Sequence, residues 1–154
     1  MPGRDPEPLL RTSYFRVLIG EQELGFAEVS RLTSETELTP PAQEPLHRFE
    51  TVVLRRAVTR STELYDWRRN IVAGVDDRRV VTIHQLEAPG GRIANTWRLT
   101  GAWPRRWSGP AFNAAESSVA YEELELAFDD AVWLKQRTTP QKRPSRSRTT
   151  TPGG

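Results

Sequence analysis

The chain has 154 residues, of which 36% are hydrophobic and 27% charged, and it contains twelve prolines. This length suits one domain with its own core, and the composition excludes a collagen-like or fully disordered chain. Because the sequence holds no cysteine, disulfides, thiolate nucleophiles and cysteine-based metal sites are excluded. No run of about 18 apolar residues occurs, and residues 1–6 lack the apolar stretch that a signal peptide needs, so we expect a cytosolic protein with neither a membrane anchor nor a signal peptide.

Positive charge is concentrated at the C-terminal end. Six of the 22 basic residues lie in residues 135–154, which contain no acidic residue, so residues 1–134 hold 16 basic and 20 acidic residues, a net charge of about −4. Ordering this tail would cost backbone entropy without burying apolar surface. We predict a disordered basic tail at 135–154 and a flexible N-terminal arm at 1–12. The tail is either a basic arm that contacts nucleic acid, an acidic partner or an acidic lumen, or an inert extension.

The N-terminal half of the chain carries strand patterns. Residues 14–19 are aromatic and β-branched and end at a polar turn at 20–23, which predicts a strand entering a hairpin. Residues 33–38 alternate Thr or Ser with Glu, as a solvent-facing strand does. Prolines then interrupt the chain at positions 40, 41 and 45. Residues 49–56 predict the next strand.

One amphipathic helix is predicted between residues 61 and 74. Ser61 or Thr62 can accept a hydrogen bond from the first free amides of the helix, next to an acidic first turn. Leu64, Trp67 and Ile71 recur at i, i+3 and i+7, so we expect these three side chains to anchor the helix on a sheet. A glycine at position 74 predicts the end of the helix.

The C-terminal half returns to strand patterns. Residues 79–86 predict a strand that a Pro-Gly-Gly turn joins to a returning strand at 94–103, and residues 119–128 alternate with a period closer to 2 than to 3.6. Short turns between consecutive strands favour antiparallel pairing, and one helix cannot cover both faces of such a sheet. The predicted fold class is mainly β: an antiparallel β-barrel or sandwich over residues 13–134 with one flanking α-helix.

The sequence indicates no catalytic residue, no cofactor-binding residue and no metal ligand. His47 falls in the proline-rich loop. The acidic and histidine residues around His84 have no spacing that resembles a metal site or a catalytic triad, so we interpret His84 as an ordinary strand histidine. Glu123 and Glu125 share a strand face that Glu122 does not share. Two carboxylates alone are weak support for acid–base chemistry, and a solvated or interface face explains them better. With no glycine-rich phosphate loop either, we predict that the protein is not an enzyme.

Five tryptophans are the most informative side chains. Trp103 and Trp107 flank two arginines in a stretch that is too short and polar to be wholly core. Tryptophan and arginine are enriched where one protein buries itself in another, whereas core packing is the alternative for Trp67 and Trp97. The residues that we assign to a subunit or ring interface are Trp103, Arg105, Arg106, Trp107, Arg55 and Arg56.

Four stretches together resemble the tail tube proteins of contractile bacteriophages and of phage-like contractile injection systems. They are FRVLIG at 15–20 with GFAEVSRL at 25–32, LRRAV at 54–58 with LYDW at 64–67, WRLTGAWP at 97–104, and AYEELEL at 120–126. The stretches occur in the family's order and cover roughly residues 13–130.

This resemblance implies a structural subunit that forms homohexameric rings around a lumen. Rings stack into a tube inside a contractile sheath on a baseplate, and contraction drives the tube through a target envelope while protein or DNA cargo travels inside. Assembly is expected in the bacterial cytoplasm, with no membrane anchor. Ring closure would pair strand edges that are dangerous in a monomer. Glu35 and Glu37 are expected to face the lumen.

The sequence departs from the family pattern at residues 39–46, where a glycine-rich stretch is shortened, and at Ala57, which replaces a glycine. In the family this region contacts neighbouring subunits and rings. Two versions therefore stay open, the main tube subunit and a tube-initiating or end-adapting paralogue that links the tube to the baseplate or cap. A monomeric β-barrel binding module is a third alternative. The basic tail is not part of the family pattern.

Overall fold

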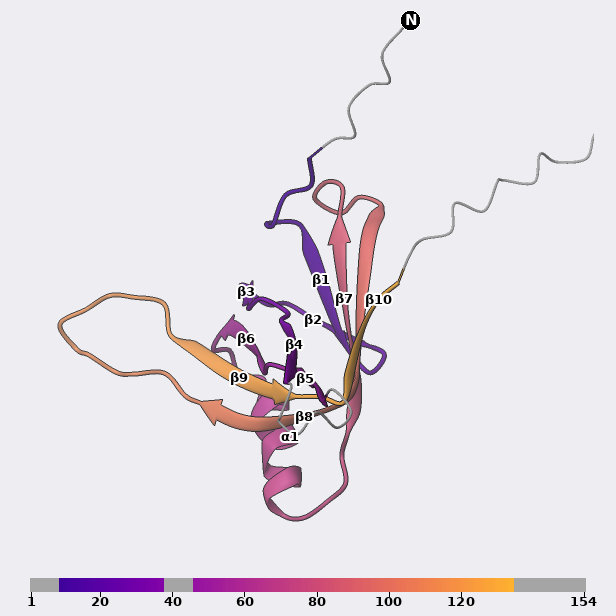
Figure 1. Cartoon of the computed structure of the whole chain (residues 1–154). Helices are drawn as coiled ribbons and strands as arrows, with labels where there is room; N and C mark the ends of the chain where they lie inside the picture. The colour runs from indigo at the N-terminus through magenta and orange to yellow at the C-terminus, as the bar shows by residue number, and fades with distance from the viewer. Residues whose placement is uncertain (1–8, 38–45, 135–154) are drawn as a thin grey trace, which may run out of the picture.

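The computed structural model describes residues 9–37 and 46–134. The prolines at 40, 41 and 45, the predicted tail and most of the predicted N-terminal arm lie outside the described residues. Ten strands and one helix occur within the described ranges (Figure 1). They are β1 (Phe15–Ile19), β2 (Gln22–Leu24), β3 (Glu28–Val29), β4 (Ser34–Glu37), β5 (Leu46–Phe49), β6 (Val52–Ala57), α1 (Glu63–Val72), β7 (Arg79–Leu86), β8 (Ile93–Ser108), β9 (Tyr121–Ala127) and β10 (Asp130–Leu134).

Two antiparallel sheets share the long strand β8. The first sheet has the order β2-β1-β7-β8-β10 and uses residues 93–102 of β8, whereas the second has the order β8-β9-β6-β3 and uses residues 103–108. Strands β4 and β5 form a separate hairpin. The predicted class, an antiparallel β-barrel or sandwich with one flanking helix, is confirmed.

The bend that sends β8 from one sheet to the other lies at Gly101. Its φ of +64° is a left-handed backbone conformation that residues other than glycine rarely adopt. Opposite the bend, the Asp129 amide donates to the Thr100 carbonyl oxygen at 2.9 Å, and a Cβ on Gly101 would collide with the Asp129 carboxylate. Arg78 forms an ion pair with that carboxylate, with 3.6 Å between Nη1 and Oδ2. The missing side chain at position 101 therefore makes room for the corner between the sheets.

The core lies between the two sheets and under α1. Alternating residues of each strand point inward, as period-2 patterning requires. Trp67 of α1 is 1% exposed, its indole nitrogen donates to the Asp77 carbonyl oxygen at 2.7 Å, and the Arg79 guanidinium lies 4.8 Å from the centre of its ring. The buried apolar side chains of this core are Val17, Ile19, Val52, Leu54, Leu64, Trp67, Val81, Ile83, Leu99, Ala102, Leu124 and Leu126.

The helix follows the predicted range, but its predicted cap is wrong. Leu64 and Trp67 are buried and Ile71 is partly buried. Thr62 occupies the cap position, yet its hydroxyl donates to the Asp66 carboxylate at 2.8 Å instead of accepting from a backbone amide. A carboxylate is the stronger acceptor, so the hydroxyl turns towards it. The helix ends at Val72, and the predicted glycine, Gly74, follows two residues later with a φ of +81°.

Three strand predictions need correction. The strand predicted at 49–56 is interrupted, because the Glu50 amide bonds to Thr33 and the chain passes from β5 of the hairpin to β6 of the second sheet. The strand predicted at 94–103 continues to Ser108, because Pro104 sits at a register shift where a missing N–H is tolerated. Strand β10 was not expected, because its pairing partner within the described residues is the distant β8.

Substitution of Gly101 by alanine tests the bend. We expect a loss of roughly 1–3 kcal/mol of unfolding free energy, because alanine strains the positive φ and displaces Asp129. Chemical denaturation measures the loss. Gly25→Ala is the matched control, with no atom within 4 Å and no positive φ. Equal midpoints for the two variants would contradict this account of the corner.

Truncation of Trp67 tests the helix anchor. Trp67→Ala should lower the free energy of unfolding by roughly 3–5 kcal/mol, because it removes a buried ring and leaves a cavity. Val72→Ala on the same helix is the control, since Val72 is 55% exposed. Thermal melting should show a much larger fall in melting temperature for Trp67→Ala than for Val72→Ala. Equally small falls for the two variants would refute the role of Trp67 in anchoring the helix.

Candidate assembly interface

The outer face of the second sheet carries a ladder of charges. Glu28 of β3, Arg55 of β6 and Glu123 of β9 lie directly opposite one another across the three strands. Arg55 is 3.8 Å from each carboxylate, and its guanidinium lies 3.9 Å from the centre of the Tyr121 ring. These side chains face outward because their neighbours in the chain point into the core.

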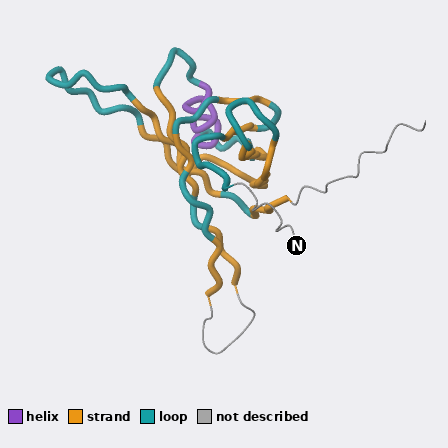
Figure 2. The backbone as a smooth tube through the Cα atoms, turned by 90° about the horizontal axis from the view of Figure 1, so that it is seen from above, coloured by secondary structure: helices purple, strands orange, loops and turns teal. Residues whose placement is uncertain are grey.

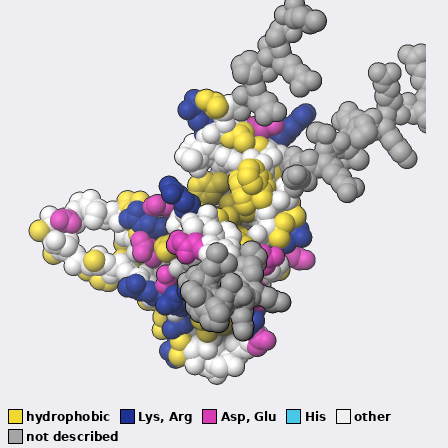
Figure 3. Space-filling view, viewed as in Figure 1, with side chains coloured by type: hydrophobic (Ala, Val, Ile, Leu, Met, Phe, Trp, Pro, Cys, Tyr) yellow, Lys and Arg dark blue, Asp and Glu magenta, His cyan; other side chains and the backbone are white. Residues whose placement is uncertain are grey.

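A second row continues this face towards β8. Arg106 of β8 lies opposite Glu125 of β9, whose carboxylate accepts a hydrogen bond of 2.7 Å from the Thr51 hydroxyl. Figure 3 shows acidic and basic side chains mixed over this region. We define the charged sheet face as Glu28, Arg55, Arg106, Glu123 and Glu125. Its charges alternate in sign, so they favour hydration over an apolar contact.

Arg56 lies inside the protomer. It is 7% exposed and faces Glu122, which is 4% exposed, with 3.5 Å between Nε and Oε1, while Glu63 at the start of α1 lies 3.6 Å from Nη1. Within the described residues, Nε of Arg56 and Oε1 of Glu122 have no hydrogen-bond partner. The cluster ties the helix to β6 and β9. This buried position does not suit the interface role that the sequence suggested for Arg56.

The stretch from Trp103 to Trp107 divides into inward and outward side chains. The Trp107 ring packs edge-on against Tyr65 of α1, with 5.0 Å between ring centres, and is partly buried against the core. Trp103 is partly buried and lines a shallow hollow beside Ile71 at the end of the helix. Arg105 is exposed at the register shift of β8, and no described residue pairs with it. Trp103, Arg105 and Arg106 are therefore available at the surface, and Trp107 largely is not.

The strand edges differ in how they are protected. Among the described residues, β3 pairs only with β6, so its outer edge is open. The edge of β8 beyond the bend is covered, because Arg68 of α1 donates to the Pro104 carbonyl oxygen at 2.9 Å and Pro104 has no N–H. Figure 1 shows α1 beside this part of β8. The second sheet thus has one open and one covered edge.

Glu35 and Glu37 lie on β4, opposite Arg48 and Leu46 of β5. In Figure 2 this hairpin projects from the body of the protein. The Glu35 side chain is exposed. The structure places both residues on the separate hairpin rather than on the charged sheet face, and their lumenal role stays a prediction.

The histidine in β7 has a structural setting. Nδ1 of His84 lies 2.8 Å from the Thr96 hydroxyl oxygen. Burial, and to a lesser extent the positive charge of Arg16, lower the pKa of His84. Among residues 9–37 and 46–134, no group of three or more potential ligands could hold a metal ion, and no helix is long and apolar enough to span a membrane.

Known proteins share the sequence pattern and the fold of this chain. The family described as T4-like virus tail tube protein gp19 matches residues 11–132. A chain from the anti-feeding prophage tube-terminating cap superposes with a TM-score of 0.67 at 16% identity, covering 87% of this chain and 96% of that one. A chain from an extracellular contractile injection system, the PVC sheath–tube complex, gives 0.64 at 20% identity, covering 83% and 93%. Hcp1 from Flavobacterium johnsoniae gives 0.59 at 13% identity, covering 78% and 94%. Curated proteins give no match.

The family match spans most of the chain and includes every strand of the two sheets apart from the end of β10. The chain therefore belongs to the T4-like virus tail tube protein family, and the resemblance noted in the sequence is confirmed. The solved structures share its fold, which is that of tube proteins of contractile injection systems and of Hcp proteins.

Removal of Glu122 tests the buried ion pair. Glu122→Leu should cost roughly 3–5 kcal/mol, because it removes the carboxylate beside Nε of a buried guanidinium that otherwise contacts Glu63 and the Ser61 carbonyl oxygen. The double variant Arg56→Met/Glu122→Leu should be more stable than Glu122→Leu alone. Glu123→Leu, which removes an exposed carboxylate from the same strand, should change stability by at most about 1 kcal/mol. Denaturant titration of the four proteins measures this, and a double variant less stable than Glu122→Leu would contradict it.

Proposed function

We propose that the protein is the subunit of the inner tube of a contractile phage tail or contractile injection system. Six copies form a ring, and rings stack into a conduit within a sheath. The observation that carries this proposal is the tail tube family match over residues 11–132. Similar folds in a PVC sheath–tube complex and in a sixfold-symmetrised anti-feeding prophage baseplate support it. Assembly would take place in the bacterial cytoplasm, with sheath and baseplate proteins as partners.

The open edge of β3 supports ring formation. An unpaired edge exposes backbone donors and acceptors that invite another chain, and a closed ring satisfies them. On the other side of the second sheet, α1 covers β8. The two sides of the protomer thus differ, as a head-to-tail ring requires. Trp103 and Arg105 stand near the covered side and would contact a neighbouring subunit or ring, whereas Arg106 belongs to the charged sheet face.

The charged sheet face is suited to line the channel, continued by Glu35 and Glu37 on the projecting hairpin. Its carboxylates and guanidinium groups keep water bound and offer no apolar surface on which protein or DNA cargo would stick. Arg55 is held between two carboxylates, so its charge is partly neutralised. A hydrated wall of this kind lets cargo move through the channel without adsorbing to it. We therefore assign the protein a structural rather than an enzymatic role.

A second candidate is an end-adapting subunit that closes the tube or joins it to another component. The observation that favours it is the similarity to a tube-terminating cap and to a sheath/tube terminator, with TM-scores of 0.67 and 0.65. Such a subunit would form rings that do not stack on themselves.

Negative-stain electron microscopy of the purified chain tests both candidates. Stacked rings support the main tube subunit, and single rings at every concentration support the end-adapting subunit. Particles without ring symmetry would contradict the proposal and favour a monomeric binding module.

The double substitution Trp103→Ala/Arg105→Ala tests the contact surface. We expect it to abolish or strongly reduce rings or stacks while the protein still unfolds cooperatively, because both side chains are at least partly exposed. Trp103→Phe/Arg105→Lys keeps an aromatic ring and a charge and should assemble. Unchanged assembly of the alanine variant would remove these residues from the interface.

A further inference from the structure

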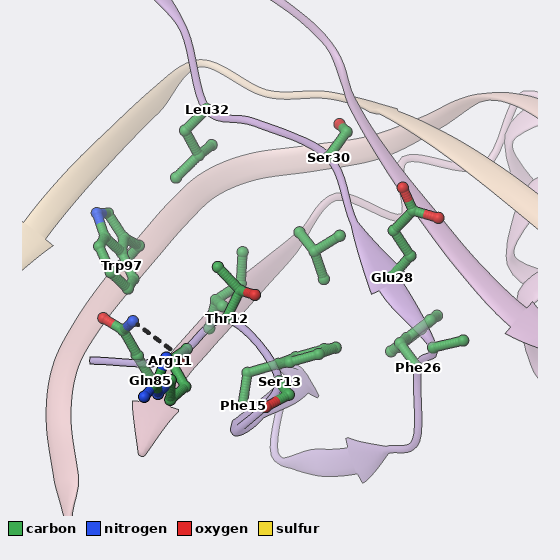
Figure 4. A pocket seen from close by; sticks show the side chains of 13 residues that line it. Arg11, Thr12, Ser13, Phe15, Phe26, Glu28, Ser30, Leu32, Gln85 and Trp97 are labelled. Carbon is green, nitrogen blue, oxygen red and sulfur yellow. Dashed lines mark hydrogen bonds between the residues drawn. The ribbon is translucent and has the colours of Figure 1, made fainter. Parts of the chain in front are cut away.

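An apolar groove opens where the first sheet extends beyond the second. It has a volume of about 700 Å³ and is lined by side chains from β1, β3, β7 and β8 and the segments beside them. Figure 4 shows Phe15, Phe26, Leu32 and Trp97 around one common space. In Figure 3 hydrophobic side chains gather in front of β1, β7 and β10. These four side chains pack against the core on one side and remain partly exposed on the other.

The groove continues onto a pair of indole rings that contact each other at a tilt of 31°. Trp97 lies opposite Trp133 of β10, with 5.3 Å between ring centres, and Trp133 is 61% exposed. The Trp133 indole nitrogen donates to the Asn95 side-chain oxygen at 3.0 Å, which fixes the ring on the sheet. An exposed, ordered aromatic surface of this kind is typical of a protein contact.

The loop between β8 and β9 carries a projecting aromatic side chain, which is complementary in shape to a groove. We call residues 109–120 the arm; it projects from the body, and Phe112 on it is 89% exposed. Its one charged residue is Glu116. The Asn113 carbonyl accepts a hydrogen bond of 3.1 Å from the Glu116 amide, which forms a turn directly after Phe112. Nothing in the chain's own core uses this aromatic ring.

We propose that the arm of one copy inserts Phe112 into the groove of a second copy. This inference rests on the proposed function, because it supplies a contact between tube subunits. The groove is large enough for a phenyl ring with its flanking backbone, and its apolar walls would remove that ring from water.

Charge complementarity selects the arm as the occupant. At the rim of the groove, Arg11 is exposed and no described residue pairs with its guanidinium, whereas Glu28 is already paired with Arg55. Within residues 9–37 and 46–134 the groove therefore offers a positive charge without an acidic partner, and the arm brings the carboxylate of Glu116 and no basic residue. In Figure 1 the arm points away from its own first sheet, so the contact joins different copies. Arm and groove are different surfaces, and such head-to-tail contacts build rings or stacks.

Engineered cysteines test the contact directly, because the natural chain contains none. One preparation carries Ala111→Cys on the arm, next to an intact Phe112, and the other carries Gln85→Cys on the groove wall. The two are mixed under assembly conditions and oxidised. The matched control replaces Gln85→Cys by Thr82→Cys, which lies three residues earlier on the same strand and on its opposite face.

A disulfide-linked heterodimer with the Gln85→Cys partner, and at least fivefold less with the Thr82→Cys partner, is the expected result, because a disulfide requires Cα atoms within about 7 Å. Equal yields with both partners would indicate random collision and overturn the proposal. Assembly of the natural chain without the Gln85 cross-link would overturn the arm contact and leave the tube assignment standing.

Two further readouts separate this contact from the proposed function. Phe112→Ser should lose rings or stacks, whereas Val119→Ser at the base of the arm should keep them, because Phe112 alone enters the groove. Normal assembly of Phe112→Ser would overturn the contact. A natural chain that stays monomeric in light scattering and gives no cross-link would overturn the contact and the tube assignment together, whereas a cross-link without rings would overturn only the tube assignment.

Discussion

The architecture depends on the bend of β8 at Gly101. One strand serves two sheets because its first ten residues pair with β7 and its last six pair with β9. The corner requires a positive φ and an empty space in front of Asp129. From this single constraint follow the enclosed core, the separate outer face of the second sheet and the overhang of the first sheet that opens the groove.

The two exposed surfaces of the protomer have opposite chemistry. The charged sheet face mixes carboxylates and guanidinium groups on neighbouring strands, whereas the groove and the exposed Trp133 are apolar and aromatic. A hollow tube needs both kinds of surface, one that stays wet towards a channel and one that is removed from water by a neighbouring copy. A monomeric domain would have little reason to keep an aromatic ring as exposed as Phe112.

Local patterns predicted the elements whose burial alternates cleanly. Strands β1, β7 and β9 and the helix repeat apolar residues at their own period, so they are readable without tertiary information. The continuation of β8 through Pro104 and the existence of β10 depend on pairing with distant strands. No local pattern carries that information, and the groove was missed for the same reason.

The interface residues were predicted from the types of side chain that are enriched at protein contacts. Because successive residues of a strand face opposite sides of the sheet, some of these side chains lie on the surface and others in the interior. Arg55 and Arg106 face outward, while Arg56 shares a face with Leu54 and Glu122 shares one with Leu124, so these two charges meet inside. That alternation was present in the sequence and could have identified the buried pair.

The mass of the purified natural chain in solution, measured by light scattering at rising concentration, tests the central claim most directly. The account predicts particles whose mass is six times that of the chain, or a multiple of that value. A single-chain mass at every concentration would contradict a ring-forming tube subunit.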